Sequence, residues 1–206
     1  VSIAIVGKYV DLKDSYKSLN EALDHAGIKN LAKVEGNMID AAKITKGNAS
    51  KILKTFQAVL IPGGFGTRGI EGMIIACKYA RENKLPYFGI CLGMQIAIIE
   101  FSRNILNLKN ANSTEFNKKT KYPVIGLVTE WKDASGKTEH RTENSNLGGT
   151  MRLGGQKCLI KKSSHSYKLY KKLTITERHR HRYEVNPEYK KELISKGMDI
   201  VGTSLD

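Results

Sequence analysis

Hydrophobic residues along this chain gather in short runs that alternate with segments of mixed polarity. The runs at 2–7, 58–61 and 86–90 are almost wholly apolar, which is typical of strands buried on both faces of a parallel sheet. Apolar residues at helical spacing predict helices over 14–25, in part of 44–56, over 71–82 and over 94–103. This alternation predicts an α/β fold with a mostly parallel central sheet and helices on both of its faces.

Glycine and capping residues set the expected element boundaries. Asp14 and Ser15 are expected to cap the first helix, and Gly27 to end it. A strand over 33–40 is predicted more weakly, because Gly36 and Asn37 interrupt its pattern.

The second half of the chain has a less regular pattern. It predicts a polar excursion over 133–146, a helix over 187–196 that Gly197 stops, and strands over 124–129, 146–153, 157–160 and 198–202. No internal repeat or linker interrupts the chain, so we expect one domain over 1–206.

Cys91 lies between an apolar strand and a predicted helix, with Gly89 and Gly93 two positions away on either side. This spacing is typical of a nucleophile elbow, in which a sharp turn presents the nucleophile to the amides that open the next helix. Such amides stabilise a thiolate and bind an oxyanion. A buried core cysteine is the alternative interpretation.

A glycine-rich loop at 62–66 follows the strand at 58–61. Sites in parallel sheets lie at the carboxyl ends of the strands, where this loop and Cys91 are both expected. Amides of the loop then supply one arm of an oxyanion hole, and the amide of Leu92 supplies the other. Taken alone, such a loop is often only a tight turn.

The amino-acid composition is that of a globular protein domain. The 206 residues are 40% hydrophobic and 26% charged, which is ordinary for a globular domain. No apolar run approaches the roughly 20 residues of a membrane helix. The three cysteines are widely spaced and form no disulfide framework, which favours a cytoplasmic setting.

The net charge of +14 allows a nucleic-acid partner. The lysines are, however, spread along the chain without interleaved aromatic residues, as on a solvated surface. We therefore expect no nucleic-acid partner.

The loop at 62–66 followed by the segment 89–95 resembles the class I (triad) glutamine amidotransferases, whose fold is flavodoxin-like. Four further stretches narrow the resemblance to the glutaminase domains of the CTP synthase family: 7–9, 111–116, 148–154 and 177–186. Cysteine-elbow peptidases and deglycase-like proteins usually place a histidine directly after the cysteine, whereas here Leu92 follows.

The resemblance implies hydrolysis of L-glutamine, with the ammonia passed to a separate N-terminal synthetase domain that aminates UTP to CTP. ATP, UTP and Mg²⁺ belong to that parent enzyme, GTP activates it, and it assembles as a homotetramer; this domain itself needs no cofactor and no metal. By the same resemblance Cys91 is the nucleophile, the oxyanion residues are Gly64 and Leu92, and the glutamine-binding residues are Gly64, Leu92, Gly93, Met94, Gln95, Glu115 and Arg182.

A zwitterionic ligand needs an anion for its ammonium group and a cation for its carboxylate, which Glu115 and an arginine supply. A solvated loop carboxylate is the alternative for Glu115. In an extended segment Arg178, Arg180 and Arg182 share one face, and the two histidines between them the other; a basic surface strand is the alternative. His179 and His181 also allow a metal pair, although no third ligand accompanies them.

A cysteine nucleophile of this kind needs a histidine base oriented by a carboxylate. The family carries this pair in a His-Pro-Glu segment, which this sequence lacks. We expect that the chain is truncated at its C-terminal end, that the synthetase domain is absent from it, and that the chain alone hydrolyses glutamine negligibly. A degenerate, non-catalytic amidotransferase with a regulatory role is the alternative.

Overall fold

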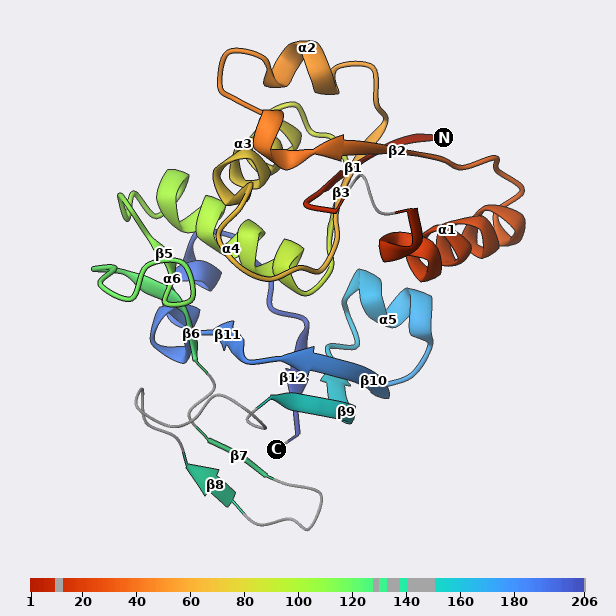
Figure 1. Ribbon diagram of the computed structural model, residues 1–206. Coiled ribbons are helices and arrows are strands. Elements are labelled where there is room, and N and C mark those ends of the chain that lie inside the picture. The colour runs from red at the N-terminus through yellow and green to blue at the C-terminus, as the bar shows by residue number, and fades with distance from the viewer. Residues whose placement is uncertain (10–12, 128–129, 133–137, 141–150, 206) are drawn as a thin grey trace. The chain divides into compact units, whose positions relative to one another are not determined.

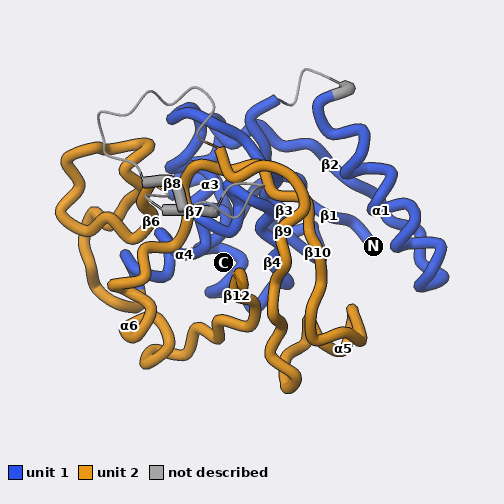
Figure 2. Tube along the Cα trace, turned by 90° about the horizontal axis from the view of Figure 1, so that it is seen from below, with its two compact units in different colours: residues 1–104 blue, residues 105–206 orange. Residues whose placement is uncertain are grey.

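The computed structural model describes residues 1–9, 13–127, 130–132, 138–140 and 151–205. The chain divides into two compact units, unit 1 (residues 1–104) and unit 2 (residues 105–206), which Figure 2 colours separately. Each unit has its own sheets, and each is described by itself.

Unit 1 is built on a four-stranded parallel sheet with the order β2-β1-β3-β4. Its strands are β1 (Ser2–Gly7), β2 (Glu35–Asp40), β3 (Ala58–Ile61) and β4 (Tyr87–Gly89). The expected strands and their parallel arrangement are therefore confirmed. The pairing of β3 with β4 brings the ends of these two strands to one edge, with Ile61 opposite Gly89.

Helices cover both faces of this sheet, with α3 and α4 on one side and α1 on the other (Figure 1). The helical elements of unit 1 are η1 (Lys13–Tyr16), α1 (Lys17–Lys29), η2 (Ala41–Lys43), α2 (Ala49–Leu53), α3 (Ile70–Glu82) and α4 (Leu92–Asn104). The side chains between the sheet and α3 and α4 include Val59, Ile61, Met73, Ile96 and Ile99, each at most 1% exposed. Burial of these aliphatic groups is the main stabilising term for such a layer.

The predicted ends of the first helix are wrong. A 3-10 turn precedes α1, which begins at Lys17 and continues through Gly27 to Lys29. Gly27 is buried, and a Cβ atom there would lie 2.6 Å from the carbonyl oxygen of Ala32. This glycine is needed because the chain passes close to it on its way back to the sheet, and not because the helix ends there.

Unit 2 consists of short strands and small helices. Its strands are β5 (Asn112–Ser113), β6 (Pro123–Leu127), β7 (Glu130–Lys132), β8 (Thr138–His140), β9 (Arg152–Ile160), β10 (Thr174–His181), β11 (Tyr183–Val185) and β12 (Gly202–Ser204). They form sheets with the orders β10-β9-β12, β11-β6-β5 and β7-β8. The helical elements are α5 (His165–Tyr170), η3 (Pro187–Tyr189) and α6 (Lys190–Ser195).

Two strand predictions in unit 2 need correction. The strands expected on either side of Gly154 and Gly155 are one strand, β9, because both glycines pair with β10 and the ladder runs through them without a register shift. The last strand is β12, later than the predicted 198–202, because the amides of Gly197 and Met198 donate to carbonyls of α6. The helix over 187–196 is confirmed as η3 followed by α6.

The polar excursion expected over 133–146 contains a strand, β8, which pairs with β7. Residues 133–137 and 141–146 of that excursion, and residues 146–150 of the strand expected next, lie outside the described residues. The strand expected over 124–129 is observed as β6, and its last two positions lie outside them as well.

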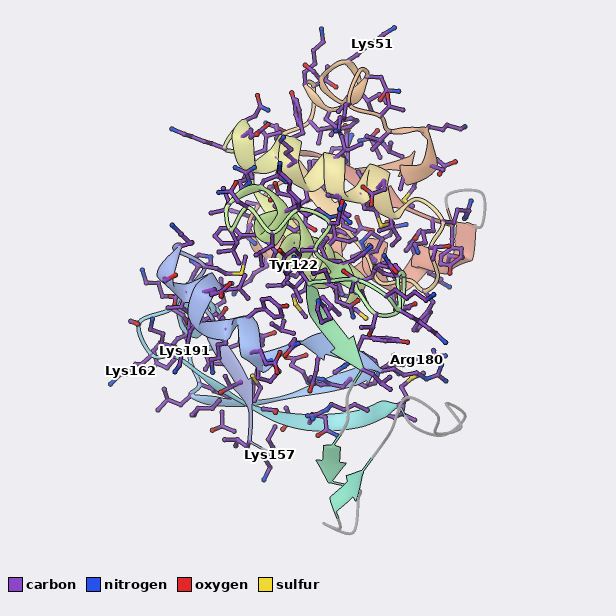
Figure 3. All side chains as sticks on the ribbon, turned by 90° about the vertical axis from the view of Figure 1, so that its left-hand side faces the viewer. Lys51, Tyr122, Lys157, Lys162, Arg180 and Lys191 are labelled. Atoms are coloured by element: carbon purple, nitrogen blue, oxygen red, sulfur yellow. The ribbon has the colours of Figure 1, made fainter. Side chains whose placement is uncertain are left out.

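The surface charge is distributed over both units. Figure 3 shows Lys51 in unit 1, and Lys157 and Lys162 in unit 2, extending away from the ribbon. None of the helices in the described part of the chain combines the length and the apolarity that crossing a bilayer requires.

Candidate active site

Cys91 occupies the turn between β4 and α4 with a φ of +54°. This left-handed conformation costs an L-residue roughly 1–2 kcal/mol, because Cβ approaches the following carbonyl oxygen. Non-glycine residues persist in it only where the surrounding structure enforces it, and such positions cluster at active sites. The strained turn between a strand and a helix is the geometry of a nucleophile elbow.

The two glycines of the elbow are required by close contacts. A Cβ atom on Gly89 would lie 2.4 Å from the carbonyl carbon of Gly93, and a Cβ atom on Gly93 would lie 2.1 Å from the carbonyl oxygen of Ile61. Real Cβ atoms do not approach backbone so closely, so any side chain at either position would push the helix away from the strand.

Hydrogen bonds fix the elbow between β3 and the first turn of α4. The Ile90 amide donates to the Ile61 carbonyl at 2.9 Å, and the Gln95 amide donates to the Cys91 carbonyl at 3.2 Å. The Tyr87 hydroxyl, which precedes the elbow, donates to the Gly93 carbonyl, which follows it, at 2.7 Å. The strand and the helix on either side of Cys91 are thereby joined.

The glycine-rich loop lies against this elbow, as the sequence predicts. A Cβ atom on Gly63 would lie 3.6 Å from Cβ of Cys91, and one on Gly64 would lie 3.3 Å from Cδ2 of Leu92. Gly64, Cys91 and Leu92 are therefore neighbours in unit 1. The glycine-rich loop and the start of α4 therefore pack together beside Cys91.

Cys77, Cys91 and Cys158 are reduced thiols, and Cys77 is the most buried of the three. Burial is the main cause that raises the pKa of the Cys77 thiol, to about 12, and the nearby Glu100 adds to it. Burial also raises the pKa of Cys158. Because the thiolate is the reactive form, burial makes Cys77 and Cys158 poor nucleophiles.

Two other residues of unit 1 are expected to bind glutamine. Of these, Gln95 is 5% exposed and Met94 is 39% exposed. Both lie in the first turn of α4 beside Gly93.

The expected glutamine-binding residues Glu115 and Arg182 belong to unit 2. Both lie near Tyr183: burial raises the pKa of the Tyr183 hydroxyl most, the negative charge of Glu115 raises it further, and the positive charge of Arg182 lowers it. The Glu115 amide donates to the Ser113 hydroxyl at 3.1 Å, which holds this residue just after β5. The Glu115 carboxylate and the Arg182 guanidinium therefore both lie close to the Tyr183 hydroxyl.

The predicted row of three arginines on one face is wrong for Arg182. Arg178 and Arg180 are exposed on β10, and His179 and His181 are less exposed on its other face, as expected. The strand ends at His181, and Arg182 lies at the bend before β11, half-buried. The reason is that β11 pairs with β6 instead of continuing along β9.

His179 and His181 contact one another directly. Nδ1 of His179 and Nε2 of His181 lie 2.8 Å apart in a hydrogen bond, whereas two nitrogen ligands of one tetrahedral metal lie about 3.3 Å apart. No cluster of three metal-ligating side chains occurs among the residues that the structure describes.

The sequence analysis assigned no individual role to Lys8 or Tyr87. In the structure Lys8 stabilises the glycine-rich loop, and Tyr87 stabilises the turn at Cys91. Lys8 is only 3% exposed, and its ammonium group donates to the carbonyls of Phe65 and Gly66 in the glycine-rich loop. A lysine that directly follows a buried strand at the site edge of a sheet was the available signal. Tyr87 gave no such signal in the sequence, because an aromatic residue in a strand usually serves only to pack against its neighbours.

Comparison with known proteins agrees with this geometry. The class-I glutamine amidotransferase family matches residues 11–206. Among solved structures, the glutaminase domain of Trypanosoma brucei CTPS with bound acivicin is 37% identical, with a TM-score of 0.82 over 98% of this chain and 74% of that one. This chain therefore belongs to the class-I glutamine amidotransferase family.

Proposed function

We propose that this chain is the glutamine-hydrolysing domain of a CTP synthase, which releases ammonia from L-glutamine for the ATP-dependent amination of UTP. The observation that carries the proposal is the contact of the glycine-rich loop with a strained cysteine elbow, with 3.6 Å between Cβ of Cys91 and the Cβ position of Gly63. The identity of 37% to a CTPS glutaminase domain supports this choice of parent enzyme.

In the proposed reaction the Cys91 thiolate attacks the side-chain amide carbon of glutamine. The carbonyl oxygen becomes an oxyanion that accepts hydrogen bonds from the Gly64 and Leu92 amides. When the carbon–nitrogen bond breaks, the nitrogen takes a proton and leaves as ammonia, and a glutamyl thioester remains on Cys91. Water then hydrolyses the thioester to glutamate and restores the thiol.

Two further sets of residues bind the amino acid in this proposal. In unit 1 Gly93, Met94 and Gln95 follow the nucleophile in α4 and contact the substrate chain. In unit 2 the Glu115 carboxylate pairs with the substrate ammonium group, and the Arg182 guanidinium pairs with its carboxylate.

Proton transfer requires a general base, which the family resemblance implies is a histidine oriented by glutamate. None of the five histidines of the chain lies in a His-Pro-Glu segment. We therefore expect slow acylation of Cys91 in this chain. The partner in the proposal is an N-terminal synthetase domain that uses ATP, UTP and Mg²⁺, responds to GTP and forms a homotetramer in the cytoplasm.

The test is labelling with a diazo-ketone analogue of glutamine, with acivicin as a second reagent, followed by peptide mapping. We expect slow modification confined to Cys91, and protection by glutamine. Cys91→Ser abolishes the label, while Cys158→Ser, which removes a thiol of similar exposure, leaves it unchanged.

Two results would contradict the proposal. Equal modification of Cys91 and Cys158 would show that no glutamine site selects Cys91. Absence of any labelling, together with absence of glutamine binding in calorimetry, would support instead a non-catalytic amidotransferase module with a regulatory role.

A further inference from the structure

Lys8 is a buried cation at the end of the first strand of unit 1. It directly follows Gly7, the last residue of β1, and only 3% of its surface is exposed. Burying an ammonium group is costly unless hydrogen bonds replace its water. A lysine retained in such a place therefore needs a compensating structural or chemical role.

The ammonium group of Lys8 binds the loop that follows the third strand. Nζ donates to the Phe65 carbonyl at 3.0 Å and also to the Gly66 carbonyl. Hydrogen bonds from a charged donor are stronger than those between neutral groups. Two consecutive carbonyls of one loop are thus fixed by one side chain that comes from a different strand.

The aliphatic stem of Lys8 also contacts the loop at Gly64. A Cβ atom on Gly64 would lie 3.5 Å from Cδ of Lys8 and 3.3 Å from Cδ2 of Leu92. Gly64 therefore packs against both Lys8 and the residue that follows Cys91. Removal of the Lys8 ammonium group would loosen this part of the loop.

The backbone of Lys8 is itself fixed by Tyr16. The amides of Lys8 and Tyr9 lie 3.2 and 3.4 Å from the Tyr16 hydroxyl, to which they donate. Tyr16 is 7% exposed, and its hydroxyl lies 2.7 Å from the Cβ position of Gly7. This contact gives Lys8 a rigid base from which to hold the loop.

We propose that Lys8 is a positioning residue for the oxyanion hole, which keeps the Gly64 amide in place beside Cys91 through its bonds to the Phe65 and Gly66 carbonyls. The inference rests on the proposed function, because it assigns the loop amide to the oxyanion. Lys8 acts through the loop and does not itself touch the reacting atoms. Preorganised donors are effective because they need no rearrangement as charge develops.

The test is Lys8→Met in the full chain, since methionine keeps most of the stem and removes the donor. Lys51→Met is the matched control, because Lys51 is an exposed lysine of the same unit (Figure 3). Two electrophiles are compared at Cys91: the diazo-ketone analogue of glutamine, whose ketone oxygen needs the oxyanion hole, and iodoacetamide, which does not. Hydrogen exchange of the amides at 63–67 is followed by mass spectrometry.

For Lys8→Met we expect the rate constant for the analogue to fall by about 10- to 100-fold, as for a misplaced catalytic group, with the iodoacetamide rate unchanged. Exchange of the loop amides should rise by about tenfold, while exchange in α3 stays as in the wild type. Lys51→Met should match the wild type in every measurement.

Equal slowing with both electrophiles, or unchanged loop exchange, would overturn the inference. If the analogue does not label the wild type, loop exchange alone decides whether Lys8 holds the loop, and the proposed function fails as well if calorimetry detects no glutamine binding. If Lys8→Met does not fold, the same measurements on Lys8→Gln, which keeps a shorter neutral donor, decide the question.

Discussion

The carbonyl oxygen of Ile61 lies 2.1 Å from the point where a Cβ atom on Gly93 would stand. The same oxygen accepts a hydrogen bond from the Ile90 amide at 2.9 Å. The end of β3 therefore packs directly against the turn that carries Cys91. This contact explains why a glycine follows Cys91 at this spacing.

Gly93→Ala should separate α4 from β3 and disturb the elbow. We expect the free energy of unfolding to fall by about 3 kcal/mol, at the upper end of the cost of overpacking, and labelling of Cys91 by the glutamine analogue to be lost. Urea unfolding and peptide mapping measure the two effects. Gly126→Ala is the control, because nothing lies within 4 Å of a Cβ atom there; a similar loss in both variants would contradict the contact.

The positive φ of Cys91 predicts that glycine at position 91 is more stabilising than alanine. Cys91→Gly relieves the left-handed strain that Cys91→Ala keeps, so the glycine variant should be more stable by about 1 kcal/mol. Both variants lack the thiol and should be inert to the analogue. Equal midpoints in urea unfolding of the two variants would show that the turn is not strained.

An ion pair with a buried carboxylate joins α3 to α4. Nε and Nη2 of Arg81 donate to the Glu100 carboxylate, with the shortest distance 2.8 Å, and the Glu100 side chain is 2% exposed. Arg81→Ala leaves a buried charge without its main partner and should cost about 3–5 kcal/mol of unfolding free energy. Combining Arg81→Met with Glu100→Met should recover most of this loss.

The control for the ion pair is the exposed pair of Lys161 and Asp199, whose atoms also lie 2.8 Å apart. Lys161→Ala should cost less than about 1 kcal/mol, because water screens this pair. A double variant as unstable as Arg81→Ala alone would contradict the assignment of the cost to the unpaired carboxylate.

His181 makes the stability of unit 2 dependent on pH. Burial, followed by the charges of His179 and Arg152, lowers the pKa of His181 from 6.5 to about 4. Between these pH values the unfolded chain binds a proton at His181 that the folded chain does not, so acid favours unfolding. The contribution of His181 is thus present above pH 6.5 and is lost as the pH falls toward 4.

Urea unfolding from pH 7.5 to 4 should show this loss in the wild type and a shallower dependence in His181→Gln. His165→Gln serves as the control, because His165 is exposed on α5. The same slope in His181→Gln as in the wild type would show that another group titrates.

Much of unit 1 could be predicted from the chain. The apolar runs at 58–61 and 86–90 coincide with β3 and β4 within one or two residues. The run at 58–61 is apolar because β3 is buried, whereas β4 is the edge strand of its sheet and leaves Phe88 63% exposed. The elbow at Cys91 and the loop at Gly64 were also predicted, since glycine at fixed spacing is a local requirement of the backbone. Family motifs then pointed to glutamine chemistry.

Predictions failed where a distant segment decides the local conformation. Gly27 lies within a helix because Ala32 returns against it, and Arg182 leaves its strand because β11 pairs with β6. Neither contact leaves a periodic pattern in the residues nearby.

The amino-acid sequence by itself determined the parallel sheet of unit 1, the sharp turn at Cys91 and the family, because apolar periodicity and glycine spacing are properties of neighbouring residues. Only the tertiary structure decided that Lys8 holds the loop beside Cys91 and that Ile61 excludes a side chain at Gly93. These contacts join residues about 30 to 60 positions apart in the chain, and they exist only once the strands have paired in parallel.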